Sequence, residues 1–85
     1  MSYYTYVLLS LKNNDIYIGS AEDLYDRIDL HNQGKVKSTK GYKPWKLLEH
    51  YEFKSRSEAF RHEKFLKTGQ QKEIIKDKYG QVAKQ

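Results

Sequence analysis

Residues 3–19 read YYTYVLLSLKNNDIYIG, and this stretch decides the fold. Its first part is rich in aromatic, β-branched and aliphatic residues, which predicts a β-strand over residues 3–9. The Asn- and Asp-rich residues that follow indicate a turn, because both tolerate left-handed backbone. A second short strand over residues 16–19 completes a hairpin. In one register of this hairpin Tyr6 lies opposite Tyr17, with both side chains on one face of the sheet.

Outward from the hairpin, Ser20 predicts the N-cap of a helix that ends at residues 32–34, where a glycine follows asparagine and glutamine. A basic loop runs over residues 35–46. Residues 45–53 then predict a third strand, entered through the only proline of the chain.

The second half continues with helices. Ser55 and Glu58 have the spacing of a capping box and predict the start of a helix that breaks at residues 68–69. A last helix is expected over residues 70–79, with Ile74 and Ile75 facing inward.

The bulk properties limit the class of protein. A chain of 85 residues makes one small domain, which we expect over residues 1–80, with residues 81–85 as a flexible C-terminal tail. The chain has no cysteine, so disulfides and thiolate metal sites are excluded and a reducing compartment fits. There is no signal peptide pattern or long apolar run. We expect a soluble cytoplasmic protein.

Charge is unevenly distributed along the chain. Residues 1–34 carry two basic and five acidic side chains, whereas residues 35–85 carry fourteen basic and six acidic ones. The loop over residues 35–46 has five lysines, two aromatic residues and no acid. Such a loop suits a groove that follows phosphates, with Tyr42 or Trp45 available for stacking. The alternative is a mobile loop whose Trp45 only anchors it to the core. The expected nucleic-acid-binding residues are Lys35, Lys37, Lys40 and Lys43.

Three charged or titratable residues are candidates for chemistry. Arg27 and His31 are four residues apart and so share one helix face. A guanidinium beside the apolar stripe can bind a phosphate, although pairing with Asp23 or Asp26 is an alternative. Glu63 falls on the apolar stripe of its helix. A carboxylate there must be paired, protonated or bound to metal. A salt bridge to Lys67 or Arg27, or one hard divalent cation, would satisfy it.

These residues, in this order, resemble the GIY-YIG endonuclease family. The stretch over residues 4–6 occupies the place of the first family tripeptide, and residues 17–19 match the second. Residues 23–28, followed by His31 and Asn32, are similar to the arginine helix of the family, and residues 55–64 to its glutamate helix. The resemblance covers residues 3–78. It is greatest to small stand-alone members, related to the N-terminal nuclease domain of the bacterial excision-repair endonuclease.

The resemblance implies a layered α+β structure, the GIY-YIG nuclease fold, in which a three-stranded antiparallel β-sheet is flanked by helices. It also implies a DNA endonuclease that hydrolyses phosphodiester bonds with a single divalent cation, Mg²⁺ or Mn²⁺, in repair or recombination. In this reading Tyr6 is the general base, Tyr17 positions water or phosphate, Arg27 stabilises charge on phosphorus, and Glu63 binds the metal. The implied catalytic set is Tyr6, Tyr17, Arg27, His31 and Glu63.

Two other functions stay open. The same fold can bind nucleic acid without cutting it, or it can serve as a protein-interaction adaptor through its sheet face. A domain this small recognises few base pairs, so a protein partner or a homodimer would supply specificity.

Overall fold

A computed structural model describes residues 2–83, and the side chains up to Tyr79. Its strands are β1 (Tyr3–Ser10), β2 (Ile16–Ala21) and β3 (Trp45–Phe53). Its helices are α1 (Leu24–Asn32), α2 (Arg56–Leu66) and α3 (Gly69–Ala83), and a short 3₁₀ helix, η1, spans Lys40–Tyr42. The strands form one antiparallel sheet in the order β2-β1-β3. The predicted α+β fold with a three-stranded antiparallel sheet is confirmed.

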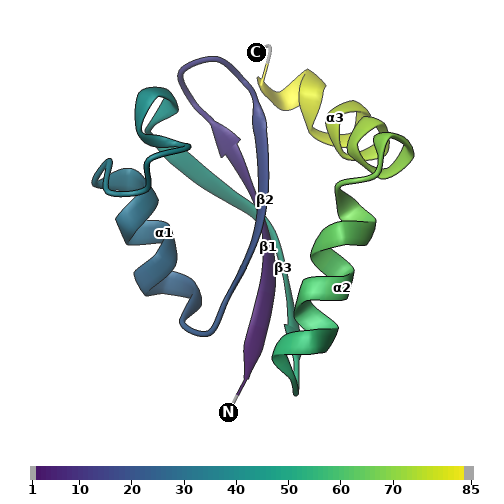
Figure 1. The fold of residues 1–85 in the computed structure, drawn as a ribbon. Helices are drawn as coiled ribbons and strands as arrows, with labels where there is room; N and C mark the ends of the chain where they lie inside the picture. The colour runs from purple at the N-terminus through teal and green to yellow at the C-terminus, as the bar shows by residue number, and fades with distance from the viewer. Residues whose placement is uncertain (1, 84–85) are drawn as a thin grey trace.

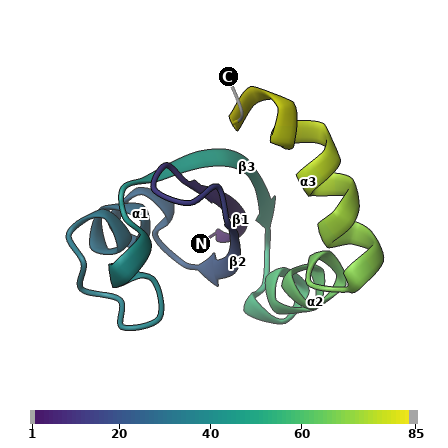
Figure 2. The same cartoon turned by 90° about the horizontal axis from the view of Figure 1, so that it is seen from above.

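The helices lie on opposite faces of the sheet (Figures 1 and 2). Helix α1 covers one face, where Leu24 and Ile28 pack against Tyr6 and Leu8 of the central strand. Helices α2 and α3 cover the other face, where Leu66 and Ile75 pack against β1 and β2. Alternate residues of β1 therefore serve two cores, which explains why this strand is buried on both faces.

Helix α2 is fixed to the sheet by local and long-range contacts. Ser55 caps its first turn, because its hydroxyl accepts a hydrogen bond from the Glu58 backbone N–H at 3.2 Å, so the predicted capping box is confirmed. The buried Thr5 hydroxyl donates to the Ala59 carbonyl at 2.7 Å. This contact holds one turn of α2 against the central strand and sets the position of the residues that follow.

Several boundaries differ from the prediction. Strand β2 continues to Ala21, so Ser20 is a strand residue; the N-cap of α1 is Asp23, whose carboxylate accepts from the Asp26 backbone N–H at 3.2 Å. The prediction of inward-facing isoleucines is right for Ile75 and wrong for Ile74, which is exposed because it lies on the solvent side of α3.

The C-terminal end also differs. Helix α3 extends to Ala83, beyond the predicted end of this helix at residue 79, and the flexible tail expected over residues 81–85 stays a prediction. Residues 84–85 of that expected tail lie outside the described residues. None of the helices within residues 2–83 has both the length and the hydrophobicity needed to cross a membrane.

Candidate active site

The centre of the site is Tyr6, which lies on β1 opposite Gly19 of β2 and is 1% exposed. A Cβ atom at Gly19 would come within 2.6 Å of the Tyr6 hydroxyl oxygen and 2.8 Å of its Cζ atom. Any residue with a Cβ atom at this position would force the phenol to shift, because Cβ atoms essentially never come closer than 3.0 Å to another heavy atom. Gly19 therefore allows the ring to lie across the neighbouring strand.

The sequence left the hairpin register open, and the structure does not have the register that places Tyr6 opposite Tyr17. Tyr17 lies opposite Leu8, and Tyr6 lies opposite Gly19, where the absence of a Cβ atom leaves space for the Tyr6 ring. The two tyrosines nevertheless share a sheet face, with ring centroids 6.3 Å apart. The two phenols therefore lie close together, as expected, although the residues are not directly opposite each other.

His31 of α1 completes an aromatic cluster with the two tyrosines. Its ring centroid lies 5.8 Å from that of Tyr6 and 4.9 Å from that of Tyr17. His31 is fully buried, although its place in the last turn of α1 is equally typical of an exposed residue that interacts with the helix dipole. Trp45 packs against the other side of Tyr17, at 6.1 Å, and closes the cluster.

A chain of hydrogen bonds fixes the protonation pattern of this cluster. His31 Nε2 lies 3.0 Å from the Tyr6 hydroxyl, and its Nδ1 lies 2.7 Å from the Thr39 hydroxyl. The single Thr39 proton is directed at the Val36 carbonyl at 3.4 Å, so Thr39 accepts from Nδ1–H. We assign the tautomer from this network: Nε2 carries the lone pair and accepts the hydrogen bond of Tyr6.

Burial keeps both groups uncharged in the free protein. It raises the pKa of Tyr6 to about 12, against the opposing effect of the Arg27 guanidinium beside its hydroxyl. Burial, together with the positive charge of Arg27, lowers the pKa of His31 to about 4. At neutral pH the site therefore holds a protonated phenol that donates to a neutral imidazole.

Arg27 is the cation of the site. It is half-buried on α1 and lines a hollow of about 290 Å³, together with Ser20 of β2. Among the side chains of residues 2–79 it forms no ion pair, so the alternative pairing with Asp23 or Asp26 is not found. A guanidinium without a carboxylate partner, beside a hollow, is available to an anion such as a phosphate.

Glu63 approaches from the opposite layer of the fold. Its carboxylate Oε1 accepts from the Ser20 hydroxyl at 2.6 Å, and its Oε2 lies 2.8 Å from Lys67 Nζ. Its negative charge also contributes to the raised pKa of Tyr6, so it lies within electrostatic reach of the phenol. Tyr6, Arg27 and Glu63 thus meet at the β2 edge around Gly19 and Ser20, although α1 and α2 lie on different faces.

The donor set permits only one kind of metal site. The side chains of residues 2–79 include no group of three or more His, Asp or Glu residues that could hold an ion together. Mg²⁺ commonly uses one or two carboxylates and completes its shell with water and substrate phosphate. Glu63 with the Ser20 hydroxyl fits that pattern, provided that Lys67 releases one carboxylate oxygen.

The basic loop contributes Thr39 to this centre, whereas its lysines lie on the surface. The expected phosphate-binding lysines are all exposed: Lys35, Lys37, Lys40 and Lys43. Tyr42 is also exposed, at 45%, whereas Trp45 is only 6% exposed and donates through Nε1 to the Thr39 carbonyl at 3.2 Å. Trp45 is therefore the anchor of the loop, and the expectation that it could stack on a nucleotide is wrong.

Two functional neighbours were not expected from the sequence. Ser20 was assigned to a helix cap, and its contact with Glu63 spans 43 residues, which no local pattern predicts. Thr39 lies in the loop with no motif around it, yet it is 1% exposed and orients His31. The contact between Lys67 and Glu63, in contrast, could be expected from the sequence, because the two residues are four apart on one helix.

The fold and this set of side chains define a class of protein. The family model described as the GIY-YIG catalytic domain matches residues 2–79, and the chain belongs to the GIY-YIG family, as its motifs indicate. It is similar to the UPF0213 protein SH2523 of Staphylococcus haemolyticus, with 36% identity over 75 residues, covering 87% of this chain and 90% of that protein. It is also similar to the solution NMR structure of the UPF0213 protein BH0048 from Bacillus halodurans, with 35% identity and a TM-score of 0.53, covering 88% of this chain and 82% of that one.

Proposed function

We propose that this protein is an endonuclease that hydrolyses phosphodiester bonds in DNA with one divalent cation, Mg²⁺ or Mn²⁺. The observation that carries the proposal is the meeting of Tyr6, Tyr17, Arg27 and Glu63 at one edge of the sheet. A hydrolase of phosphodiesters needs a proton acceptor for water, a cation for the phosphate and stabilisation of the leaving oxygen.

The proton acceptor is the Tyr6–His31 pair. Tyr6 alone, with a pKa of about 12 raised by burial, is protonated and cannot act as a phenolate. In the proposed step water attacks phosphorus and gives its proton to the Tyr6 oxygen while the Tyr6 proton passes to His31 Nε2. The phosphorus bond to the leaving oxygen breaks, the leaving oxygen takes a proton from solvent, and the imidazole ends as an imidazolium that donates through Nδ1–H to Thr39.

Arg27 connects phosphate binding to this proton transfer. Its guanidinium binds a phosphate oxygen and stabilises the charge that grows on the phosphoryl group. The positive charge of Arg27 is also one cause of the low pKa of His31. A bound phosphodiester offsets this charge and so raises the pKa of His31, which makes the imidazole a better acceptor when substrate is present.

Glu63 is the proposed metal ligand, assisted by Ser20. A divalent cation held there would stabilise the negative charge on the leaving oxygen. The Lys67 ammonium forms an ion pair with Oε2 of Glu63, so it balances the charge of this carboxylate in the free protein. The exposed lysines of the basic loop would bind backbone phosphates of the DNA at a distance from the reacting phosphate. We place the activity in repair or recombination, with a protein partner or a homodimer supplying specificity.

Cleavage assays with a matched control test the proposal. Purified protein is incubated with plain, flapped and branched DNA in the presence of Mg²⁺ or Mn²⁺. We expect cleavage to fall by about 100-fold or more in Glu63→Ala, whereas Glu73→Ala, which removes an exposed carboxylate on α3, should cut as the wild type does. Equal cleavage by both variants, or no cleavage of any substrate by the wild type, would refute the catalytic proposal.

A second candidate function is nucleic-acid binding without cleavage. The observation that favours it is the ion pair between Lys67 and Glu63, which occupies the only carboxylate of the proposed metal site. Salt-dependent DNA binding that survives both Arg27→Ala and Glu63→Ala, with no Mn²⁺ bound, would favour this function over the first.

A further inference from the structure

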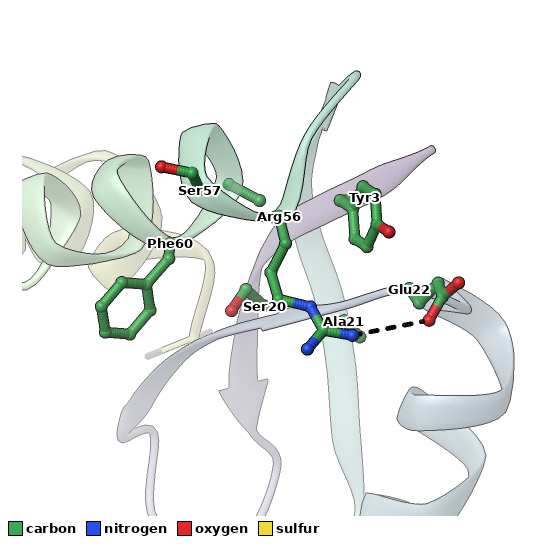
Figure 3. Close-up of a pocket in the computed structure, with 8 residues that line it drawn as sticks. Tyr3, Ser20, Ala21, Glu22, Arg56, Ser57 and Phe60 are labelled. Carbon is green, nitrogen blue, oxygen red and sulfur yellow. Dashed lines mark ion pairs between the residues drawn. The ribbon is translucent and has the colours of Figure 1, made fainter. Parts of the chain in front are cut away.

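A second and larger hollow adjoins the candidate active site. It has a volume of about 630 Å³ and lies between the end of β2 and the first turns of α2 (Figure 3). Ser20 lines both this hollow and the smaller one beside Arg27, and the same serine donates to Glu63. The larger hollow therefore lies next to the place where we expect the reacting phosphate and the metal.

Two flat side chains border this hollow. Phe60 and Arg56 are four residues apart on α2, and both line the hollow. Figure 3 shows the Arg56 guanidinium beside Ala21 and Glu22, whereas Phe60 extends from α2 on the other side of Ser20. Phe60 is 47% exposed. The Arg56 side chain is 79% exposed and lies 3.8 Å from Glu22, a separation at which an exposed ion pair contributes little. Both flat groups can therefore accept a ligand at small cost.

We propose that this hollow holds an unpaired nucleobase next to the scissile phosphate, stacked on Phe60 and flanked by the Arg56 guanidinium. This inference rests on the proposed nuclease function and adds a substrate class to it: strands with unpaired nucleotides, such as flaps and overhangs. Aromatic and guanidinium planes stack on any base. The volume lies within the range of small-ligand pockets, roughly 300–1,000 Å³.

Charge around Phe60 agrees with a nucleotide occupant. The Lys64 ammonium lies over one face of the Phe60 ring, 4.7 Å from its centroid. A base would therefore stack on the opposite face, and Lys64 would bind the phosphate attached to that base. This arrangement is different from the basic loop, whose exposed lysines would contact only the phosphate backbone of the nucleic acid. The hollow would bind a base that has left its partner, because stacking in a side pocket requires a free ring face.

The chain offers a matched control for Phe60. Phe65 lies on the same helix and is 52% exposed, but its ring packs toward His62, with centroids 6.0 Å apart, and it does not line the hollow. Replacing either phenylalanine removes a similar exposed surface. A general effect of lost hydrophobic surface would affect the two variants equally, and a stacking site would affect only Phe60→Ala.

The test compares oligothymidylate with an abasic oligonucleotide of the same length. Binding is measured by fluorescence anisotropy with EDTA present, so the result does not depend on cleavage. We expect the wild type and Phe65→Ala to bind oligothymidylate about tenfold more tightly than the abasic strand, and Phe60→Ala to lose this preference. Oligouridylate in parallel shows whether the base pocket also accepts RNA.

A second measurement detects the stacked base directly. Phe60→Trp fluorescence, corrected for Trp45 with the wild type, should be quenched by oligothymidylate and not by the abasic strand. The inference is overturned if the wild type shows no preference for bases, if both alanine variants lose the preference equally, or if the tryptophan is not quenched. Base binding without cleavage would refute the proposed nuclease function and support the base-binding hollow. Cleavage without base preference would support the nuclease function and refute the base-binding hollow.

Discussion

The contact between Gly19 and Tyr6 gives the sharpest prediction. In Gly19→Ala the new methyl group would lie 2.6 Å from the Tyr6 oxygen, whereas ordinary contact begins at 3.4 Å. The ring cannot move away freely, because it is 1% exposed and hydrogen-bonded to His31 at 3.0 Å. Overpacking of this kind costs about 2 kcal/mol, which in a domain of this size lowers Tm by roughly 10 °C. Misplacing the phenol should also slow cleavage about 100-fold.

Thermal unfolding followed by circular dichroism measures the first effect, and plasmid nicking measures the second. Gly41→Ala is the control, because a Cβ atom there meets nothing within 4 Å, and its stability should change by less than about 0.5 kcal/mol. Adding Tyr6→Phe to Gly19→Ala removes the nearest clashing atom and should restore part of the lost Tm. If Gly19→Ala melts and cuts like Gly41→Ala, the reasoning about the site is refuted.

Three further predictions concern the groups around Tyr6. Thr39→Val leaves the His31 Nδ1–H without an acceptor and should cost about 1–3 kcal/mol, with ¹⁵N chemical shifts of the ring reporting a changed tautomer; an unchanged spectrum would contradict the assigned network. Burial lowers the pKa of His31 from 6.5 to about 4. Between pH 6.5 and pH 4 the imidazole therefore becomes protonated only in the unfolded chain. Urea titrations should show the free energy of unfolding falling by roughly 3 kcal/mol from pH 6.5 to pH 4. His31→Gln should lack that part of the pH dependence. If the free energy of unfolding varies equally with pH in the variant and the wild type, His31 is not its cause. Lys67→Met frees Oε2 of Glu63 and should tighten Mn²⁺ binding measured by electron paramagnetic resonance, while stability changes by less than about 1 kcal/mol because Lys67 is half exposed; unchanged affinity would argue against Glu63 as the ligand.

Local patterns predicted the elements of this fold well. The capping box at Ser55 and Glu58 located the start of α2, and the enrichment in aromatic, β-branched and aliphatic residues located strand β1. The lone carboxylate on an apolar helix face singled out Glu63, because a buried charge needs a partner. These features depend on neighbours in the sequence, and a single chain is enough to recognise them.

The contacts between distant segments could not be predicted in this way. The hairpin register depends on the space that the Tyr6 ring needs over Gly19, which is a property of the packed sheet. Ser20 belongs to a strand, because its pairing with β1 and its bond to Glu63 outweigh its preference for a helix cap. Thr39 lies in a loop whose course is set by the burial of Trp45.

The position of the site on β2 also restricts how two copies of this chain can associate. Within residues 2–83, strand β2 pairs with β1 alone and forms one edge of the sheet, and such an edge is a template for an added strand. A strand added along Gly19–Ala21 would cross both hollows that Ser20 lines. Under the proposed function, sheet extension on that side would cover the site, and a homodimer that supplies specificity would have to form through β3 or through the outer surfaces of the helices.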